Sequence, residues 1–237
     1  NSQIDKIHIS YFDSVLNKEK INLETEFLFS TIPITRLVEL IIPKAKSDIS
    51  NATKNLKYRS MVLLYFIIDA EKFSDYDAHY FPEIDLIFSR ISESKNYSGT
   101  KFPLNKTGIC VEIPCQEGDT IWNYSDNELS NIVIEQLDKI GLSIKSPISS
   151  IFTKHIKFVY PLYDLHFEKN FKLIVDYIKN VPKLISLGRQ GLFAHDNTHH
   201  TIEMAYRASN CLDSHLEWNS KLWAEHINDF DKNVVED

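Results

Sequence analysis

Apolar and polar residues alternate along several segments of the chain, and this period of two is typical of strands. The alternation in 4–12 and 21–30, separated by the polar stretch 17–20, predicts a hairpin that leads into a buried strand at Phe27-Leu28-Phe29. The segment 58–70 is almost continuously apolar, so we expect it to be central in a sheet. Further strands are predicted at 76–81, 84–91, 107–114, 151–160 and 183–187.

Other segments repeat their apolar residues with the spacing of a helix. The clearest helix is predicted over 123–140, where Ser125 and Glu128 form a capping box and Gly141 supplies a left-handed end. The polar segment 44–57 is expected to be a linker or a surface helix. Shorter helices are predicted over 34–43, over 168–180, from 198 to 212 with Ile202, Ala205, Tyr206, Ser209 and Leu212 on one face, and in the tail around 216–223.

This order of elements predicts a mixed α/β (α+β) fold. Residues 1–45 and 181–237 are expected to contribute to an α/β core. Residues 46–180 are expected to form an inserted domain with an antiparallel sheet and helices, because strand patterns dominate the middle of the chain.

Composition narrows the possible functions. The chain has 237 residues, of which 43% are hydrophobic and 25% charged, as in ordinary globular domains. Its formal net charge of −7 argues against a general nucleic-acid or anionic-membrane binder. No apolar run reaches the roughly 18 residues of a membrane span, and the first residues do not resemble a signal peptide. Cys110, Cys115 and Cys211 form no CxxC pair, so we expect reduced thiols in a cytoplasmic protein.

The most informative stretch lies near the end of the chain. A short predicted strand is followed by the glycine-bracketed turn Gly188-Arg189-Gln190-Gly191, and then by a helix whose N-cap is expected at Asn197 or Thr198. Glycines allow close approach of the backbone, and the first N–H groups of a helix lack partners within the helix. Together with one arginine, these features predict a site for a negatively charged group.

The same stretch resembles the C-terminal flavin-contacting motif of the FAD-dependent amine oxidase and protoporphyrinogen oxidase superfamily, to which UDP-galactopyranose mutases belong. The pattern is G-R-x-G-x-x-x-x-x-N before a helix, from Gly188 to Asn197. The resemblance implies that Arg189 lies near the FAD phosphates or ribityl chain. It also implies that the backbone at Asn197, Thr198 and His199 faces the pyrimidine edge of the flavin. Gly188, Gly191 and Leu192 would complete this cofactor-binding segment.

Three more segments are similar to parts of this superfamily. Ser30-Thr31-Ile32-Pro33 between a strand and a helix resembles the loop that passes over the cofactor, which implies cofactor contacts for Thr31 and Pro33. The residues Y-F-P-E and F-S-R-I resemble the substrate-domain sheet, which implies that Arg90 faces the substrate. The Y-P-x-Y-D turn implies that Tyr160 or Tyr163 lines the substrate pocket. Each residue also has an ordinary alternative: a turn residue for Thr31, a surface strand residue for Arg90, and half-buried packing for the tyrosines.

One part of the superfamily pattern is missing. None of the six glycines forms the G-x-G-x-x-G fingerprint that binds the ADP half of FAD. The resemblance therefore covers about the C-terminal half of the family: a partial FAD-binding domain, 1–45 with 181–237, interrupted by the substrate-binding domain 46–180. We expect this chain alone to bind FAD weakly or not at all, and to need an N-terminal FAD-binding segment as its partner. A divergent homologue that has lost the cofactor is an alternative.

The substrate and the reaction stay open at this stage. A small-molecule amine would favour an aromatic cage such as Tyr160 with Tyr163, and hydride would pass from substrate to flavin. A nucleotide sugar, as in a UDP-galactopyranose mutase-like sugar isomerase, would favour two arginines, for which Arg90 and Arg59 are candidates. Glu112, in the strand 107–114, could point inward or outward, and solvent is the side we expect.

Three further functional classes are less well supported. A metal site in the segment 195–200 is disfavoured, because its histidines lack the i, i+4 pairing on a helix that metal-binding motifs use. Nucleophilic catalysis is disfavoured, because neither G-x-S-x-G nor S-x-x-K occurs. A non-catalytic interaction domain would show an apolar face and no cofactor site.

Overall fold

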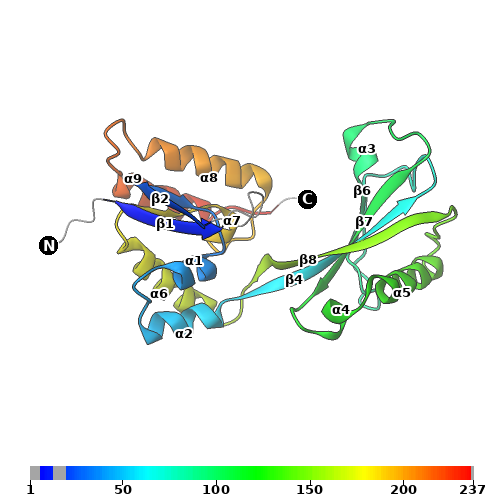
Figure 1. Ribbon diagram of the computed structural model, residues 1–237, viewed down its shortest axis with the longest axis horizontal. Helices are drawn as coiled ribbons and strands as arrows, with labels where there is room; N and C mark the ends of the chain where they lie inside the picture. The colour runs from blue at the N-terminus through cyan, green and yellow to red at the C-terminus, as the bar shows by residue number, and fades with distance from the viewer. Residues whose placement is uncertain (1–5, 13–19, 236–237) are drawn as a thin grey trace. The chain divides into compact units, whose positions relative to one another are not determined.

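The computed structural model describes residues 6–12 and 20–235, and they fold as two compact units (Figure 1). Unit 1 combines Asn1–Lys57 with Pro161–Asp237, and unit 2 is the intervening segment Tyr58–Tyr160. The mixed α/β fold with an interrupted core is therefore confirmed. The predicted polar turn at 17–20 lies outside the described residues except for Lys20. No helix in the described part of the chain is long and apolar enough to cross a membrane.

Unit 2 is built on an antiparallel sheet of five strands. The long apolar strand predicted at 58–70 lies inside this sheet, as expected, because strands on both sides pair with it. The strand order is β5 (Ala78–Tyr80), β6 (Arg90–Glu93), β7 (Thr107–Cys115), β4 (Lys57–Ile68) and β8 (Ile148–Leu162).

One helix covers one face of this sheet. Helix α5 (Asp126–Lys139) begins at the predicted capping box, and Gly141 after it has a φ of 80°, as its role in ending the helix requires. Leu129, Val133 and Leu137 of the helix are fully buried against alternate residues of β4 and β7. The unit also contains the short helices α3 (Ser94–Ser98) and α4 (Thr120–Asn123).

The strand predicted at 84–91 is wrong over most of its length. Residues 81–89 form turns and bends, Ile84 is fully exposed, and only Arg90–Glu93 pairs in the sheet. Pro82 has no N–H to donate to a ladder. The side chain of Gln136 on α5 instead accepts from the N–H of Ile87 and donates to the carbonyl of Asp85, so the helix replaces the missing ladder partners.

Unit 1 contains two small sheets and most of the helices. The predicted hairpin is present, but the strand expected over 21–30 is divided between two sheets. Strands β1 (Ile7–Phe12) and β2 (Lys20–Thr25) pair antiparallel, whereas β3 (Leu28–Ser30) pairs parallel with β9 (Leu184–Ser186). The helices are α1 (Ile34–Leu40), α2 (Ser47–Asn55), α6 (Phe167–Lys179), α7 (Gly188–Gly191), α8 (Thr198–Asn210) and α9 (Ser220–Phe230).

The structure assigns α2 and α6 to unit 1, although the sequence placed 46–180 in the inserted domain. These two helices pack on each other, and α6 also packs on β9. Their apolar residues find partners in the α/β core, because α6 buries Ile174 and Ile178 there. The polar segment 44–57 thus contains a packed helix rather than a linker.

Helices α8 and α9 run beside each other (Figure 1). The residues that α8 buries are Met204 and Ala208, followed by Cys211, and they pack with Trp223 and Phe230. The apolar face listed from the sequence is a different one, since Ile202 is 53% and Tyr206 is 70% exposed. Helical spacing alone allowed both faces, and packing against α9 selects the one that contains Met204.

Candidate functional site

The parallel pair of β3 and β9 brings two distant segments together. The N–H of Leu187 donates to the carbonyl of Ser30 at 2.9 Å, so the residue before Gly188 lies beside the residue before Thr31. A Cβ atom at Gly188 would lie 4.0 Å from the methyl group of Thr31. Two segments selected independently in the sequence, 31–33 and 188–192, are thus neighbours in unit 1. Pro33 is the N-cap of α1, and Leu192 is half-buried.

The glycine turn between β9 and α8 forms the single helical turn α7. Gly188 has a φ of 77°, which a residue with a side chain rarely adopts. Gly191 is packed so closely that an added Cβ would lie 2.8 Å from Oγ of Ser186 and 3.1 Å from the carbonyl oxygen of Ser30. The two glycines therefore serve different purposes: one sets the turn, and the other allows close packing.

Helix α8 begins where the sequence predicted. Asn197 is the N-cap, and its N–H donates to Nδ1 of His200 at 3.2 Å. Thr198 and His199 occupy the first turn, and both are exposed. The N–H groups of a first turn have no acceptor within their own helix and carry the positive end of the helix dipole.

A buried carboxylate lies just before this helix. Asp196 is only 5% exposed, and its Oδ1 lies 3.3 Å from both Nδ2 of Asn233 and Nδ1 of His200. Its Oδ2 has no hydrogen-bond partner among the described residues. Nη1 of the half-buried Arg189 donates to the carbonyl of Asp196 at 3.4 Å, so this segment ties α7 to the start of α8.

Tyr163 holds the loop between α7 and α8. Its hydroxyl donates to the carbonyl of Phe193 at 3.1 Å and accepts from the N–H of His195 at 3.0 Å. Its ring lies against Phe167 and Phe193. Burial raises the pKa of Tyr163, and the nearby Asp196 charge adds to this effect. The residue thus positions the loop, and its hydroxyl is already occupied.

We expect Tyr163→Phe to lower the free energy of unfolding by about 1 kcal/mol, because two hydrogen bonds to the backbone are lost. The amide of His195 should exchange with deuterium faster, since its acceptor is gone. Urea unfolding and amide exchange measure the two effects. Tyr206→Phe on the exposed face of α8 is the control. If the two variants have the same unfolding free energy and the same exchange rate at His195, Tyr163 does not hold this loop.

Arg90 lies in unit 2 and is paired. Its Nε donates to Oε1 of Glu112 at 2.9 Å, and its Nη2 contacts the same oxygen. The expectation that Glu112 faces solvent is wrong, because the residue is only 9% exposed. The guanidinium also lies 5.8 Å from the ring centre of Tyr80. The hydrogen bond with Glu112 raises the pKa of Arg90.

The structure does not bring Arg90 and Tyr160 together. Tyr160 is half-buried near the end of β8, and the strands β4 and β7 separate β8 from the β6 of Arg90. Three strand spacings correspond to about 14 Å. The sequence correctly placed both residues in strands of this sheet. Their separation means that they do not line one common pocket.

Sequence reasoning missed Tyr65 and Cys110 beside this ion pair. They are direct register partners across β4 and β7. Burial raises the pKa of Tyr65 to about 12, with contributions from Cys110 and Glu112. Burial also raises the pKa of Cys110. The sequence shows only that a tyrosine lies within an apolar strand. It does not specify which strand pairs with this one.

These shifts predict a loss of stability at alkaline pH. Burial raises the pKa of Tyr65 from 10 to about 12 and that of Cys115 from 9 to about 11. Above pH 9 the unfolded chain loses these protons first, so stability falls as pH rises from 9 to 12. Urea midpoints measured at about pH 8 and about pH 10.5 test this. Tyr65→Phe should reduce the fall, whereas Tyr97→Phe, at an exposed site, should leave it unchanged.

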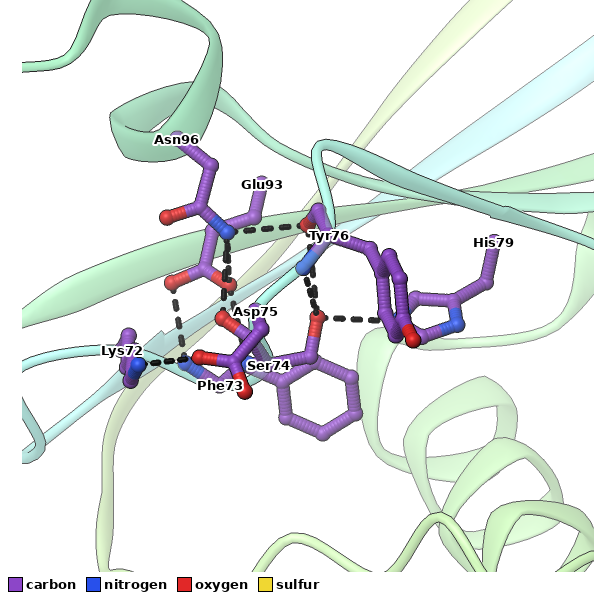
Figure 2. Close-up of polar contacts among 8 residues, drawn as sticks. All are labelled: Lys72, Phe73, Ser74, Asp75, Tyr76, His79, Glu93 and Asn96. Atoms are coloured by element: carbon purple, nitrogen blue, oxygen red, sulfur yellow. Dashed lines mark hydrogen bonds and ion pairs between the residues drawn. The ribbon is translucent and has the colours of Figure 1, made fainter.

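A second polar cluster surrounds the buried Glu93 of β6 (Figure 2). Its carboxylate accepts from the N–H groups of Phe73 and Ser74, at 2.9 and 3.1 Å, and from Nδ2 of Asn96 at 3.2 Å. The hydroxyl of Thr107 also donates to it. Asn96 lies in α3 and Thr107 begins β7, whereas Phe73 and Ser74 lie in the loop before β5, so the cluster fastens the segment leading into β5.

Histidines do not gather with other ligands in the part of the chain that the structure describes. There, no group of three or more His, Cys, Asp or Glu side chains could hold a metal ion. The rings of His199 and His200 lie 4.1 Å apart, but His200 is engaged with Asn197.

Comparison with known proteins concerns the fold. No family model and no curated protein matches the chain. Among solved structures, the chain is similar to a reduced UDP-galactopyranose mutase, with a TM-score of 0.59 and 17% identity, covering 74% of this chain and 38% of the other. It is also similar to a putative protoporphyrinogen oxidase from Exiguobacterium sp. 255-15, with a TM-score of 0.55 and 13% identity, covering 80% and 40%.

A fatty acid isomerase from P. acnes that produces CLA is a third similar structure, with a TM-score of 0.53 and 11% identity, covering 81% of this chain and 42% of the other. The chain thus spans about two fifths of the length of the structures it matches. The first two are enzyme types of the superfamily whose motif the sequence resembles. The likeness supports the α/β core with an inserted sheet as a partial copy of that fold.

Proposed function

We propose that this chain provides the flavin-contacting end and the substrate-binding sheet of an FAD-dependent oxidoreductase of the amine oxidase type. In the intact protein a hydride would pass from a substrate C–H bond to the flavin. The observation that carries the proposal is the convergence in unit 1 of Thr31, the Gly188–Gly191 turn and the start of α8. These segments are the ones that the sequence resemblance associates with the cofactor.

The residues present fit one end of the cofactor. FAD, when bound, supplies the redox chemistry. The first-turn N–H groups at Thr198 and His199 stabilise negative charge, and their exposed positions leave room for a planar ring. Arg189 adds a cation to the preceding turn, and its Nη1 donates to the carbonyl of the buried Asp196. Tyr163 keeps the intervening loop in place.

The partner of this site would be an N-terminal FAD-binding segment with a G-x-G-x-x-G loop. Parallel strands normally belong to larger sheets covered on both faces. In the described residues β3 and β9 pair only with each other. A mostly apolar cavity of about 640 Å³ borders β9, lined among others by Phe171, Leu184, Trp218 and Trp223. We propose that the FAD-binding segment packs there and extends the parallel sheet.

A flavin-dependent sugar mutase is the second candidate, favoured by the fold likeness to UDP-galactopyranose mutase. In such an enzyme the flavin would act on a sugar without net oxidation. The site in unit 1 would serve both reactions equally, so the two candidates differ in unit 2.

Titration of the chain with FAD, followed by ¹H–¹⁵N NMR, tests the proposal. We expect weak binding that shifts the amide signals of Thr198, His199 and Gly188. Arg189→Ala should reduce these shifts, whereas Arg36→Ala, at an exposed position on α1, should not. Absence of shifts at the start of α8 would refute the flavin site. A purified chain that already carries stoichiometric flavin absorbing near 450 nm would refute the need for a separate FAD-binding segment.

A further inference from the structure

The sheet of unit 2 has a second face, opposite to α5, with its own chemistry. Side chains alternate along a strand, so the residues between the buried positions of β4 and β7 point away from the helix. Tyr65 pairs in register with Cys110, Arg90 with Glu112, and Tyr80 with Arg90. These residues come from four strands and form a continuous surface.

Aromatic rings occupy both sides of this surface. Tyr65 stacks on Phe152 of β8 with ring centres 4.8 Å apart and an interplanar angle of 10°. Phe152 is 38% and Tyr80 is 58% exposed, so parts of both rings are accessible. We call the surface made of Tyr65, Tyr80 and Phe152, together with the ion pair Arg90–Glu112, the aromatic face. Exposed rings of this kind bind other planar groups by offset stacking.

The charges of the aromatic face cancel. Glu112 is nearly buried and accepts two contacts from Arg90. An anion that drew Arg90 away would leave the Glu112 carboxylate buried and unpaired, which is strongly unfavourable. Burial and neighbours raise the pKa values of Tyr65 and Cys110, so both stay uncharged at neutral pH. The face thus offers neutral donors and ring surfaces, and no spare positive charge from Arg90.

We propose that the aromatic face binds an uncharged planar part of the substrate, an aromatic ring or a conjugated system, and does not bind the pyrophosphate of a nucleotide sugar. This assignment rests on the proposed function in one respect, namely that unit 2 carries the substrate. It deepens that function by separating its two branches. The oxidoreductase branch is compatible with a neutral planar group, whereas the nucleotide-sugar branch would use Arg90 as an anion ligand.

The test uses the whole chain without flavin and two probes, indole and UDP, followed by ¹H–¹⁵N NMR. We expect indole to shift the amide signals of Tyr65, Cys110 and Glu112, and UDP to leave them and the Arg90 Nε signal in place. Phe152→Ala should weaken indole binding on the order of fivefold through loss of stacking. Phe102→Ala, at an exposed site outside the strands, should leave it unchanged.

A second variant tests the charge argument. Glu112→Gln removes the charge that neutralises Arg90, so UDP should now shift the Arg90 signal. A shift of the Arg90 signal by UDP in the unaltered chain would overturn the proposal. Equal indole affinity in Phe152→Ala and the unaltered chain would also overturn it. Because no flavin is present, failure here leaves the FAD titration of unit 1 unaffected, and failure of that titration leaves this result standing.

Discussion

We expect Gly191→Ala to lower the free energy of unfolding by about 3 kcal/mol, because a methyl group has no room at this position. The new Cβ would lie 2.8 Å from Oγ of Ser186 and 3.1 Å from the carbonyl of Ser30. Neither neighbour can move freely. The Ser186 hydroxyl donates to the carbonyl of Gly191 at 2.7 Å, and the Ser30 carbonyl accepts from Leu187 in the β3–β9 pair.

Urea unfolding followed by circular dichroism measures this loss. Gly118→Ala is the control, since Gly118 lies just before the short helix α4 and has nothing within 4 Å of the added Cβ. The control carries only the strain of its positive φ, about 1–2 kcal/mol. A Gly191→Ala protein as stable as the unaltered chain would show that the two strands do not approach this closely. The proposed flavin site would then lack the support on which α7 depends.

Features encoded by adjacent residues could be predicted from the sequence. The capping box at Ser125 and the glycine at Gly141 fix both ends of α5, because the contacts that matter lie within one turn of the helix. The N-cap at Asn197 is of the same kind. The buried strand β4 was equally clear, because a continuous apolar run is stable only inside a sheet.

Features that depend on distant partners could not be predicted from the sequence. The pairing of Arg90 with Glu112 follows from the register of β6 on β7, which no local pattern specifies. Without that partner, a glutamate in a half-polar strand is expected to face solvent. The division of 21–30 into β2 and β3 likewise depends on β9, a strand more than 150 residues later in the chain.

The candidate site of unit 1 was located by motif resemblance rather than by periodicity. The resemblance singled out Thr31 and Gly188, and the structure makes them neighbours. It gave no indication of Asp196, whose burial depends on Asn233 and His200. The sequence presented Asp196 only as part of a disfavoured metal site, and only tertiary packing reveals that its Oδ2 lacks a hydrogen-bond partner among the described residues.

Glu93→Ala should cost about 4 kcal/mol of stability, the largest effect we predict for a single side chain in unit 2. Glu93 is 2% exposed, and Figure 2 shows its carboxylate between the backbone of Phe73 and Ser74 and the side chain of Asn96. Truncation removes every acceptor at once. Two backbone N–H groups lose their partner, and a cavity remains beneath the loop.

Amide exchange separates this mechanism from a general loss of packing. We expect the amides of Phe73 and Ser74 to exchange much faster in Glu93→Ala, and those of α5 to change only with global stability. Glu93→Gln keeps one acceptor oxygen, so its stability and its exchange rates should lie between those of Glu93→Ala and the unaltered chain. Glu117→Ala, which breaks an exposed ion pair with Lys157, should have no measurable effect. If the Phe73 and Ser74 amides stay protected in Glu93→Ala, the carboxylate does not hold this loop.

The same variant links stability to the aromatic face. The loop held by Glu93 leads directly into β5, and the N–H of Glu93 itself donates to the carbonyl of Asp77 at 2.9 Å. β5 carries Tyr80, which lies against Arg90. Loosening the loop should therefore weaken indole binding, even though the Glu93 side chain lies on the sheet face opposite to the aromatic face. Unchanged indole affinity in a folded Glu93→Ala protein would show that Tyr80 contributes little to the aromatic face.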